Sequence, residues 1–242
     1  MPDAPDFFQY RLESNKNILG DMAEFAARLG AVSKYDRGGT TLFADNFDNG
    51  LAPYSAQLGG TGAKAEIVSD VTHVSGYGVK LTAGSDGNHG AGILKRVQPQ
   101  ALNMMGFEVV FSLESNISEM DIGIQQNTAT KKKNWVIAWR ASDGKIFVKP
   151  RAEGWVTFAT IPLPIDDEEI FHSLKLVVDL ESDYYVRFMV DQNLYNLSAY
   201  QGSEVNEETN QRLEFLAMNT GRLAKNDTMY LDEFIVTTDE IK

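Results

Sequence analysis

Beyond residue 37 the chain is a succession of short segments in which apolar and polar residues alternate, and this pattern constrains its fold more than any other feature. Gly, Asn, Asp and Pro separate the segments, and tight turns such as Ser142-Asp143-Gly144 join several of them. Strands do not alternate with helices, which excludes Rossmann and P-loop folds. The pattern predicts strands at 40–44, 65–69, 77–83, 90–97, 105–113, 119–126, 134–141, 144–149, 154–161, 171–180, 184–192, 194–199, 212–219 and 228–238.

So many short strands predict an all-β domain over residues 37–242, built as an antiparallel sandwich or jelly roll. Successive residues of a strand point to opposite faces of its sheet. The predicted inward residues are Phe107, Val109, Phe111 and Leu113; Met120, Ile122 and Ile124; Leu174, Leu176, Val178 and Leu180; and Val186, Phe188 and Val190. The predicted outward residues include Glu108, Glu119, Asp121, Gln125, Lys175, Tyr185 and Arg187. These polar faces are either ligand platforms or solvated surfaces.

Residues 1–36 differ from the rest and form a predicted N-terminal arm with one amphipathic helix. The helix is expected to begin near Ser14, and Gly30 follows at the position of a helix C-cap. Its apolar face consists of Ile18, Leu19, Met22, Phe25 and Leu29. Its polar face carries Lys16, Asp21, Glu24 and Arg28. An internal Gly20 costs about 1 kcal/mol relative to alanine, so we expect the helix to pack on the main domain or on a neighbouring subunit.

Charge and composition exclude several classes of partner. The 242 residues carry a formal net charge of −12, with a pI of about 4.7. Such a chain repels the phosphate backbone, so we expect no nucleic-acid partner. The one basic run, Lys131-Lys132-Lys133, is either a solvated turn or a local site for an anionic surface. The chain has no cysteine, which excludes disulfides, thiolate nucleophiles and Cys-ligated zinc.

The sequence shows no targeting segment. Its first residues are acidic and rich in proline, and no apolar stretch approaches the 18 residues of a membrane span. We therefore expect no Sec signal peptide, no membrane insertion, and synthesis in the cytoplasm.

Four segments resemble the concanavalin A-like lectin/glucanase superfamily, whose members are built from two curved antiparallel sheets. They are Leu42-Phe43-Ala44-Asp45-Asn46-Phe47-Asp48-Asn49-Gly50-Leu51, Gly78-Val79-Lys80-Leu81-Thr82 followed by Gly92-Ile93-Leu94, the segment from Phe171 to Asp179, and Tyr230-Leu231-Asp232-Glu233-Phe234-Ile235-Val236. The resemblance covers roughly residues 40–238 and implies a concanavalin A-like jelly roll without naming one family.

The superfamily contains lectins and glycosidases, and its glucanase branch carries Glu-x-Asp-x-(x)-Glu on one strand. Here Glu119-Met120-Asp121 supplies the first two acids, but Gly123 or Ile124 stands where the last glutamate belongs. Retaining glycosidases need two carboxyl groups that flank the scissile bond. We therefore expect a non-enzymatic protein and rank glycoside hydrolase third among its functions.

Sugar-binding sites combine exposed aromatic rings with amides and charged groups that bind hydroxyls. Trp135 and Trp139 share a strand face with Ile137 and are assigned to the core in preference to a binding surface. The candidate carbohydrate-binding residues are Trp155, Tyr184, Tyr185, Arg187, Glu119, Asp121 and Gln125.

Many sugar-binding sandwiches that this chain resembles hold a structural calcium near the two chain ends, and calcium takes oxygen ligands. The resemblance implies Asp45, Asp48 and Asp232 as the matching side chains. A plain turn at Asp48-Asn49-Gly50 is the alternative interpretation.

Two functions follow from these observations. The first is a structural or assembly module with a lectin-like fold, such as a capsid decoration or tail component of a virus particle, which forms homo-oligomers or binds other structural subunits. The second is a soluble module that binds a glycan. We rank assembly first because the lectins and glucanases of this fold are commonly secreted, whereas this chain shows no export signal and carries an amphipathic arm.

Overall fold

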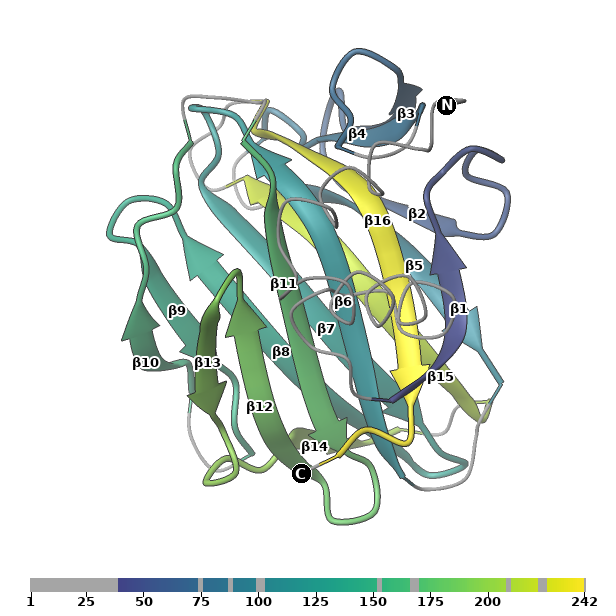
Figure 1. Ribbon diagram of the computed structural model, residues 1–242. Coiled ribbons are helices and arrows are strands. Elements are labelled where there is room, and N and C mark those ends of the chain that lie inside the picture. Colours follow the sequence, from purple (N-terminus) through teal and green to yellow (C-terminus); the bar gives the residue numbers. More distant parts are fainter. Residues whose placement is uncertain are drawn as a thin grey trace, which may run out of the picture.

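The computed structural model describes residues 39–73, 76–86, 89–98, 103–151, 154–165, 170–207, 210–221 and 226–241. These residues form two antiparallel sheets that pack face to face (Figure 1). The predicted arm, with Ile18, Leu19, Met22, Phe25 and Leu29, lies outside the described residues.

Sheet 1 contains the strands nearest both ends of the described chain. Its order is β13 (Asn193–Asn196), β12 (Tyr184–Val190), β11 (His172–Asp179), β6 (Met104–Leu113), β16 (Thr228–Thr238), β4 (Gly78–Thr82) and β3 (Lys64–Val68), with β1 (Thr40–Asp45) also paired to β16. Sheet 2 has the order β10 (Val156–Thr160), β9 (Lys145–Val148), β8 (Lys131–Arg140), β7 (Glu119–Asn127), β15 (Arg212–Gly221), β5 (His89–Val97) and β2 (Ser55–Leu58), with β14 (Ser203–Asn206) paired to β8.

All 14 strands predicted from the alternation are present, and the structure adds β2 and β14. Each added strand has four residues, and their sequences, Ser-Ala-Gln-Leu and Ser-Glu-Val-Asn, carry little apolar signal. Both form because a neighbouring strand, β5 or β8, supplies main-chain partners. Pairing of this kind cannot be seen in a short polar segment taken alone.

The core lies between the two sheets and is filled by the predicted inward residues. Phe107 of sheet 1 meets Phe215 of sheet 2 edge to face, with ring centroids 5.7 Å apart. Trp135 and Trp139 are buried in this core, as predicted, and each indole N–H donates to a main-chain carbonyl. Burial of these aromatic side chains is the main driving force for association of the two sheets.

The predicted alternation is wrong at one place, in β12. Val177 pairs with Arg187 and Val178 pairs with Tyr185, so Val186 is an extra residue in a β-bulge. The bulge turns Tyr185 into the core, where it is fully buried, and turns Val186 partly outward. Tyr185 is therefore no surface residue, contrary to the prediction.

The Tyr185 hydroxyl links the two sheets. It accepts a hydrogen bond from the main-chain N–H of Val136 at 2.8 Å. It donates its own hydrogen to the carbonyl of Val136 or Lys149, each 3.2 Å away. Burial raises the pKa of Tyr185, so the phenol stays protonated as this bonding requires. The link fixes the position of β12, which carries the candidate site.

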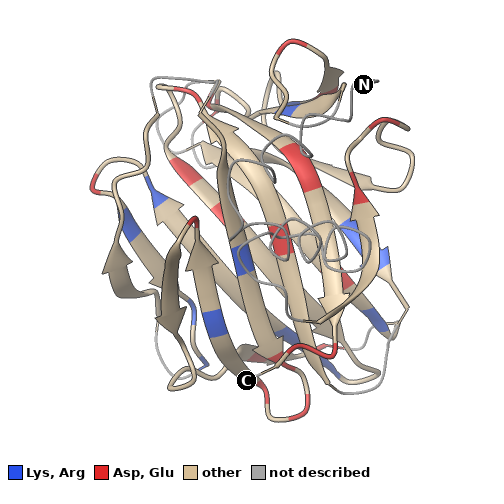
Figure 2. Cartoon of the chain, in the orientation of Figure 1, with Lys and Arg blue, Asp and Glu red and all other residues tan. Residues whose placement is uncertain are grey.

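Charged residues are distributed over the surface in mixed sign. Figure 2 shows basic and acidic residues interspersed along the strands that face the viewer. Within the part of the chain that the structure describes, no helix is long and apolar enough to cross a membrane.

Candidate functional site

A cavity of about 870 Å³ lies on the outer side of β12 and β13, at one end of sheet 1. Its lining comes from three segments: the β11–β12 hairpin, the two strands themselves, and the C-terminal turn. The lining residues are Asp179, Ser182, Tyr184, Tyr185, Val186, Arg187, Met189, Leu194, Asn196, Ser198 and Ile241.

The two-residue turn Asp191-Gln192 sets the register that builds the cavity wall. It pairs Arg187 with Asn196 and Met189 with Leu194, so all four residues stand side by side. Tyr184, Leu194 and Ile241 are exposed and give the cavity an apolar and aromatic surface. Hydroxyl and amide groups of Ser182, Asn196 and Ser198 stand among them. This mixture of an aromatic ring with neutral polar groups suits a ligand that has both apolar faces and hydroxyls.

The C-terminal turn holds Arg187 in place at the cavity wall. Glu240 Oε2 lies 2.7 Å from Arg187 Nη2, and the carbonyl of Ile241 accepts a hydrogen bond from Nη1. The other oxygen of Glu240 pairs with Lys175 Nζ at 2.8 Å and accepts from Thr237. The Glu240 side chain is fully buried, so a single carboxylate from the chain end fixes two cations of sheet 1.

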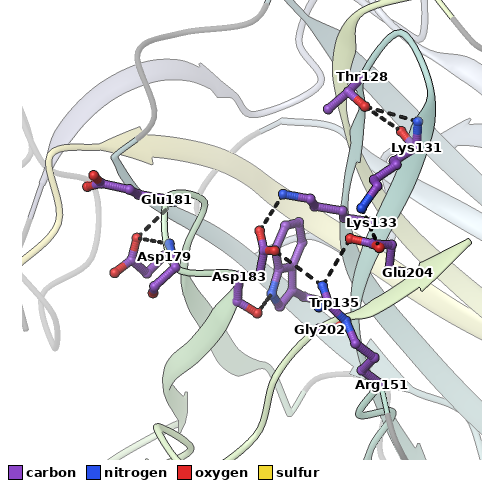
Figure 3. A network of polar contacts seen from close by, with 11 residues as sticks. Thr128, Lys131, Lys133, Trp135, Arg151, Asp179, Glu181, Asp183, Gly202 and Glu204 are labelled. Carbon is purple, nitrogen blue, oxygen red and sulfur yellow. Dashed lines mark hydrogen bonds and ion pairs between the residues drawn. The ribbon is translucent and has the colours of Figure 1, made fainter.

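The β11–β12 hairpin, which supplies Tyr184, is held by a polar network (Figure 3). Asp179 accepts hydrogen bonds from the N–H groups of Glu181 at 3.0 Å and Ser182 at 3.3 Å. Asp183 has a left-handed backbone with a φ of 68°, and its carbonyl accepts from the indole of buried Trp135 at 3.1 Å. The hairpin therefore presents Tyr184 from a fixed main chain.

The basic run of β8 belongs to the same network (Figure 3). Lys133 pairs with Asp183 at 2.5 Å, and Lys131 pairs with Glu204 at 2.8 Å. Arg151 bridges the two carboxylates at 3.2 and 3.1 Å. Two of the three lysines are thus paired with carboxylates of the chain itself, and all three belong to strand β8. These contacts support neither a solvated turn nor a site for an anionic surface.

The other predicted polar residues lie on β7 in sheet 2, away from the cavity. Glu119 is buried and lies 3.5 Å from Arg140, and Asp121 accepts a hydrogen bond from Thr220 at 2.8 Å. Gln125 donates to Asn127 at 3.1 Å and to Glu214. The structure therefore separates Glu119, Asp121 and Gln125 from Tyr184 and Arg187.

Glu214 is the centre of this second polar cluster. It accepts hydrogen bonds from Arg96 at 2.9 Å, Arg212 at 2.8 Å and Asn127 at 3.0 Å, as well as from Gln125. Burial raises the pKa of Glu214, but the hydrogen bonds from these donors outweigh it and hold the pKa below the usual 4.5. The Glu214 carboxylate is therefore fully hydrogen-bonded by side chains of the protein itself. We interpret the cluster as stabilising sheet 2.

We expect Glu214→Gln to lower the free energy of unfolding at pH 7 by about 1.5–3 kcal/mol, the range for hydrogen bonds to charged groups. The native pKa is lowered, so this stabilisation is complete above the unfolded pKa near 4.5 and is lost as the pH falls through the native value. Urea unfolding at pH 7 and pH 3 measures the difference in free energy of unfolding between the wild type and Glu214→Gln. If that difference is as large at pH 3 as at pH 7, the ionised Glu214 carboxylate is not the stabilising group.

Trp155 is exposed, as predicted, but does not line the cavity. It precedes β10 in sheet 2, with 42% of its surface accessible, and Lys149 Nζ lies 5.6 Å from its ring centroid. Of the predicted binding residues, Tyr184, Tyr185 and Arg187 therefore meet at one site, while Trp155 stands apart. Sequence reasoning missed Met189, Leu194 and Asn196. The signal was the turn Asp191-Gln192, which pairs β13 with β12 but was included in the predicted strand 184–192.

The implied calcium ligands are used in other ways. Asp45 accepts from the N–H of Phe47 at 3.0 Å, and Asp232, which is fully buried, accepts from the N–H of His73 at 2.9 Å. Asp48 accepts from the amide of Asn46 at 2.7 Å. Among the described residues, no three His, Cys, Asp or Glu side chains are grouped as metal ligands. The three aspartates do not fit a calcium site as a set, and calcium binding stays a prediction.

Comparison with known proteins identifies the fold. No family model matches the sequence. No curated protein does so either. A Bacillus subtilis protein of unknown function with a galectin-like fold superposes with a TM-score of 0.54 at 10% identity, covering 85% of this chain and 99% of that one. The cellulose induced protein Cip1 gives 0.51 at 11% identity, with 82% and 98% covered.

The potassium-bound carbohydrate recognition domain of Emp46p gives a TM-score of 0.50 at 10% identity, covering 82% of this chain and 94% of that one. Identities this low carry the fold and nothing finer. They agree with the resemblance inferred from the sequence. The chain has a lectin-like jelly-roll fold, as the resemblance to the concanavalin A-like superfamily implied, with no single family assigned.

Proposed function

We propose that the chain is a non-catalytic carbohydrate-binding module and that the cavity on β12 and β13 is its glycan site. The observation that carries this proposal is the exposed Tyr184 ring in one cavity with Ser182, Asn196 and Ser198. An aromatic ring can stack on the apolar face of a pyranose, and the neutral polar groups can bind its hydroxyls. The carbohydrate recognition domain among the structures of the same fold supports the proposal.

The charge of the site supports a neutral sugar. Among the described residues, Arg187 is the one cation in the lining, and its guanidinium is bonded to Glu240 and to the Ile241 carbonyl. Asp179, the one carboxylate of the described lining, accepts two main-chain hydrogen bonds. The site thus offers no strong excess of either sign to an ionised ligand.

We expect Tyr184→Ala to weaken glycan binding at least tenfold, which is about 1.4 kcal/mol, because the stacking surface is removed. A panel of neutral oligosaccharides, including gluco-, xylo-, manno- and galacto-oligosaccharides, is screened on an array and measured by titration calorimetry. Tyr77→Ala is the matched control, since Tyr77 is an exposed tyrosine outside the cavity. Equal affinities for the two variants, or no binding of the panel to a folded wild-type chain, would contradict the proposal.

The assembly function remains a separate prediction. It rests on residues 1–36, which lie outside the described residues. The predicted role as a component of a virus particle rests on the same residues. Light scattering of the full chain measures the oligomeric state on which it depends.

A further inference from the structure

The outer face of sheet 1 is buried, although strand alternation points it away from the core. Val177, Val110 and Ile235 expose 0%, 6% and 1% of their surface, yet none of them belongs to the hydrophobic core between the sheets. They come from β11, β6 and β16, which are adjacent strands. Glu108 and Lys175, on the same face, are buried as well. An open sheet face would leave such residues accessible to water.

The described part of the chain covers this face only at one end. The C-terminal turn places Glu240 beside Gly106, where an added Cβ would lie 2.6 Å from Oε1. No labelled strand crosses the outer faces of β6 and β11, which are turned toward the viewer in Figure 1. The turn accounts for the burial of Val177, which pairs with Gly106 and with Arg187, but the burial of Val110 and Ile235 is unexplained by the described elements.

The chain that precedes β1 arrives at the edge of the same face. Gly39 has a φ of 79°, and a Cβ added to it would lie 2.6 Å from Glu240 Oε1 and 2.8 Å from the Thr238 carbonyl. Thr40 then pairs with Thr238. Gly39, the first described residue, thus lies next to the carboxylate that covers one end of sheet 1.

The sequence before this point contains a segment of matching chemistry. The predicted helix at 14–29 carries an apolar stripe of Ile18, Leu19, Met22, Phe25 and Leu29. At 1.5 Å per residue its length is about 24 Å, which is shorter than the ten-residue strand β6. The linker, residues 30–38, spans at most about 30 Å when fully extended. This length allows the helix to lie along the outer face of sheet 1.

We propose that residues 14–29 dock as an amphipathic helix on the outer face of β6, β11 and β16 of their own chain. The apolar stripe packs on Val110 and Ile235, while the polar side of the helix faces water. Docking within one chain is favoured because the short linker gives the helix a high effective concentration at this face. The inference is independent of the glycan site, which lies beyond β11 on β12 and β13.

The absence of cysteine makes a thiol probe clean, since Val110→Cys is then the single thiol of the full chain. We expect this thiol to react slowly with a maleimide. Adding Leu19→Asp and Phe25→Asp, which place charges on the apolar stripe, accelerates the reaction at least tenfold. The matched control, Lys16→Ala with Arg28→Ala on the polar side, leaves the rate unchanged.

Two reference thiols separate undocking from unfolding. Leu58→Cys is exposed on β2 and reacts fast in every background, whereas Leu231→Cys is buried in the core and reacts slowly. Acceleration at Val110→Cys with no change at Leu231→Cys supports the proposal. A rate at Val110→Cys that is fast in the original background, or unaffected by the two aspartates, overturns it.

A second measurement avoids destabilising the helix. Met22→Cys combined with Val110→Cys is expected to form a cross-link with a short bis-maleimide, and the product has the mass of one chain. Glu24→Cys with Val110→Cys, which uses the polar side, cross-links at least tenfold more slowly. Equal cross-linking of the two pairs, or products with the mass of two chains, overturns docking within one chain.

Discussion

Glu240→Gln is expected to destabilise the protein by about 3–5 kcal/mol, the effect of breaking a buried ion pair on one side. The Glu240 side chain has no exposed surface and pairs with Lys175, which is also buried, and with Arg187, whose side chain is 12% exposed. The isosteric amide keeps the shape of the side chain but removes the negative charge. Both cations then lose this counter-charge, and the desolvation of buried Lys175 is no longer compensated.

Urea unfolding followed by tryptophan fluorescence measures this loss. Glu66→Gln is the matched control, because Glu66 forms an exposed pair with Lys64 at 3.7 Å. Exposed pairs contribute about 0–1 kcal/mol, so the control stays near the wild type. If the two variants lose the same small amount, the C-terminal turn does not stabilise the domain.

Trp135→Ala is expected to lower the free energy of unfolding by about 3–5 kcal/mol, whereas Trp155→Ala has little effect on it. Trp135 is fully buried, its indole N–H donates to the Asp183 carbonyl at 3.1 Å, and its ring packs on Gly202. Truncation leaves a cavity and removes one of two hydrogen bonds to the Asp183 carbonyl, which still accepts from the N–H of Gly202 at 2.7 Å. Trp155 has 42% of its surface exposed and loses few contacts.

The two tryptophan variants also separate a role in stability from a role in glycan binding. Thermal and urea unfolding measure stability, and binding of the same oligosaccharide panel measures the site. A large stability loss for Trp155→Ala, or none for Trp135→Ala, would mean that the two residues are placed wrongly. Because Trp155 lies outside the cavity lining, we expect Trp155→Ala to bind the panel as the wild type does.

The sequence predicts the strands well because hydrophobic alternation is a local property. Predicted segments such as 105–113 and 171–180 show their inward residues directly, and the structure buries Phe107 and Leu176 as expected. β2 and β14 escape prediction because their stability comes from neighbours distant in the chain. The reversal at Tyr185 has a similar origin, since a bulge is defined by two paired strands and not by one.

The candidate site was predictable only in part. Tyr184 and Arg187 stand out as an aromatic and a cation on one strand, and the structure places both at the cavity. Glu119 and Asp121 are also polar, but they lie on β7, which belongs to the other sheet. Which sheet a strand joins depends on the topology of the whole domain, and the strand's own sequence does not show it. The contribution of Ile241 could not be foreseen, because it depends on Asp239 and Glu240 turning back over sheet 1.

The position of Ile241 in the cavity wall bears on how the protein is handled. A purification tag or a surface linker attached after Lys242 would be separated from Ile241, a residue of the cavity lining, by Lys242 alone. It would therefore begin close to the cavity. Immobilised by that end, the protein would present its opposite side to a soluble glycan. Side-chain attachment at the far edge of sheet 2, for example through Leu58→Cys on β2, leaves the cavity open to solution.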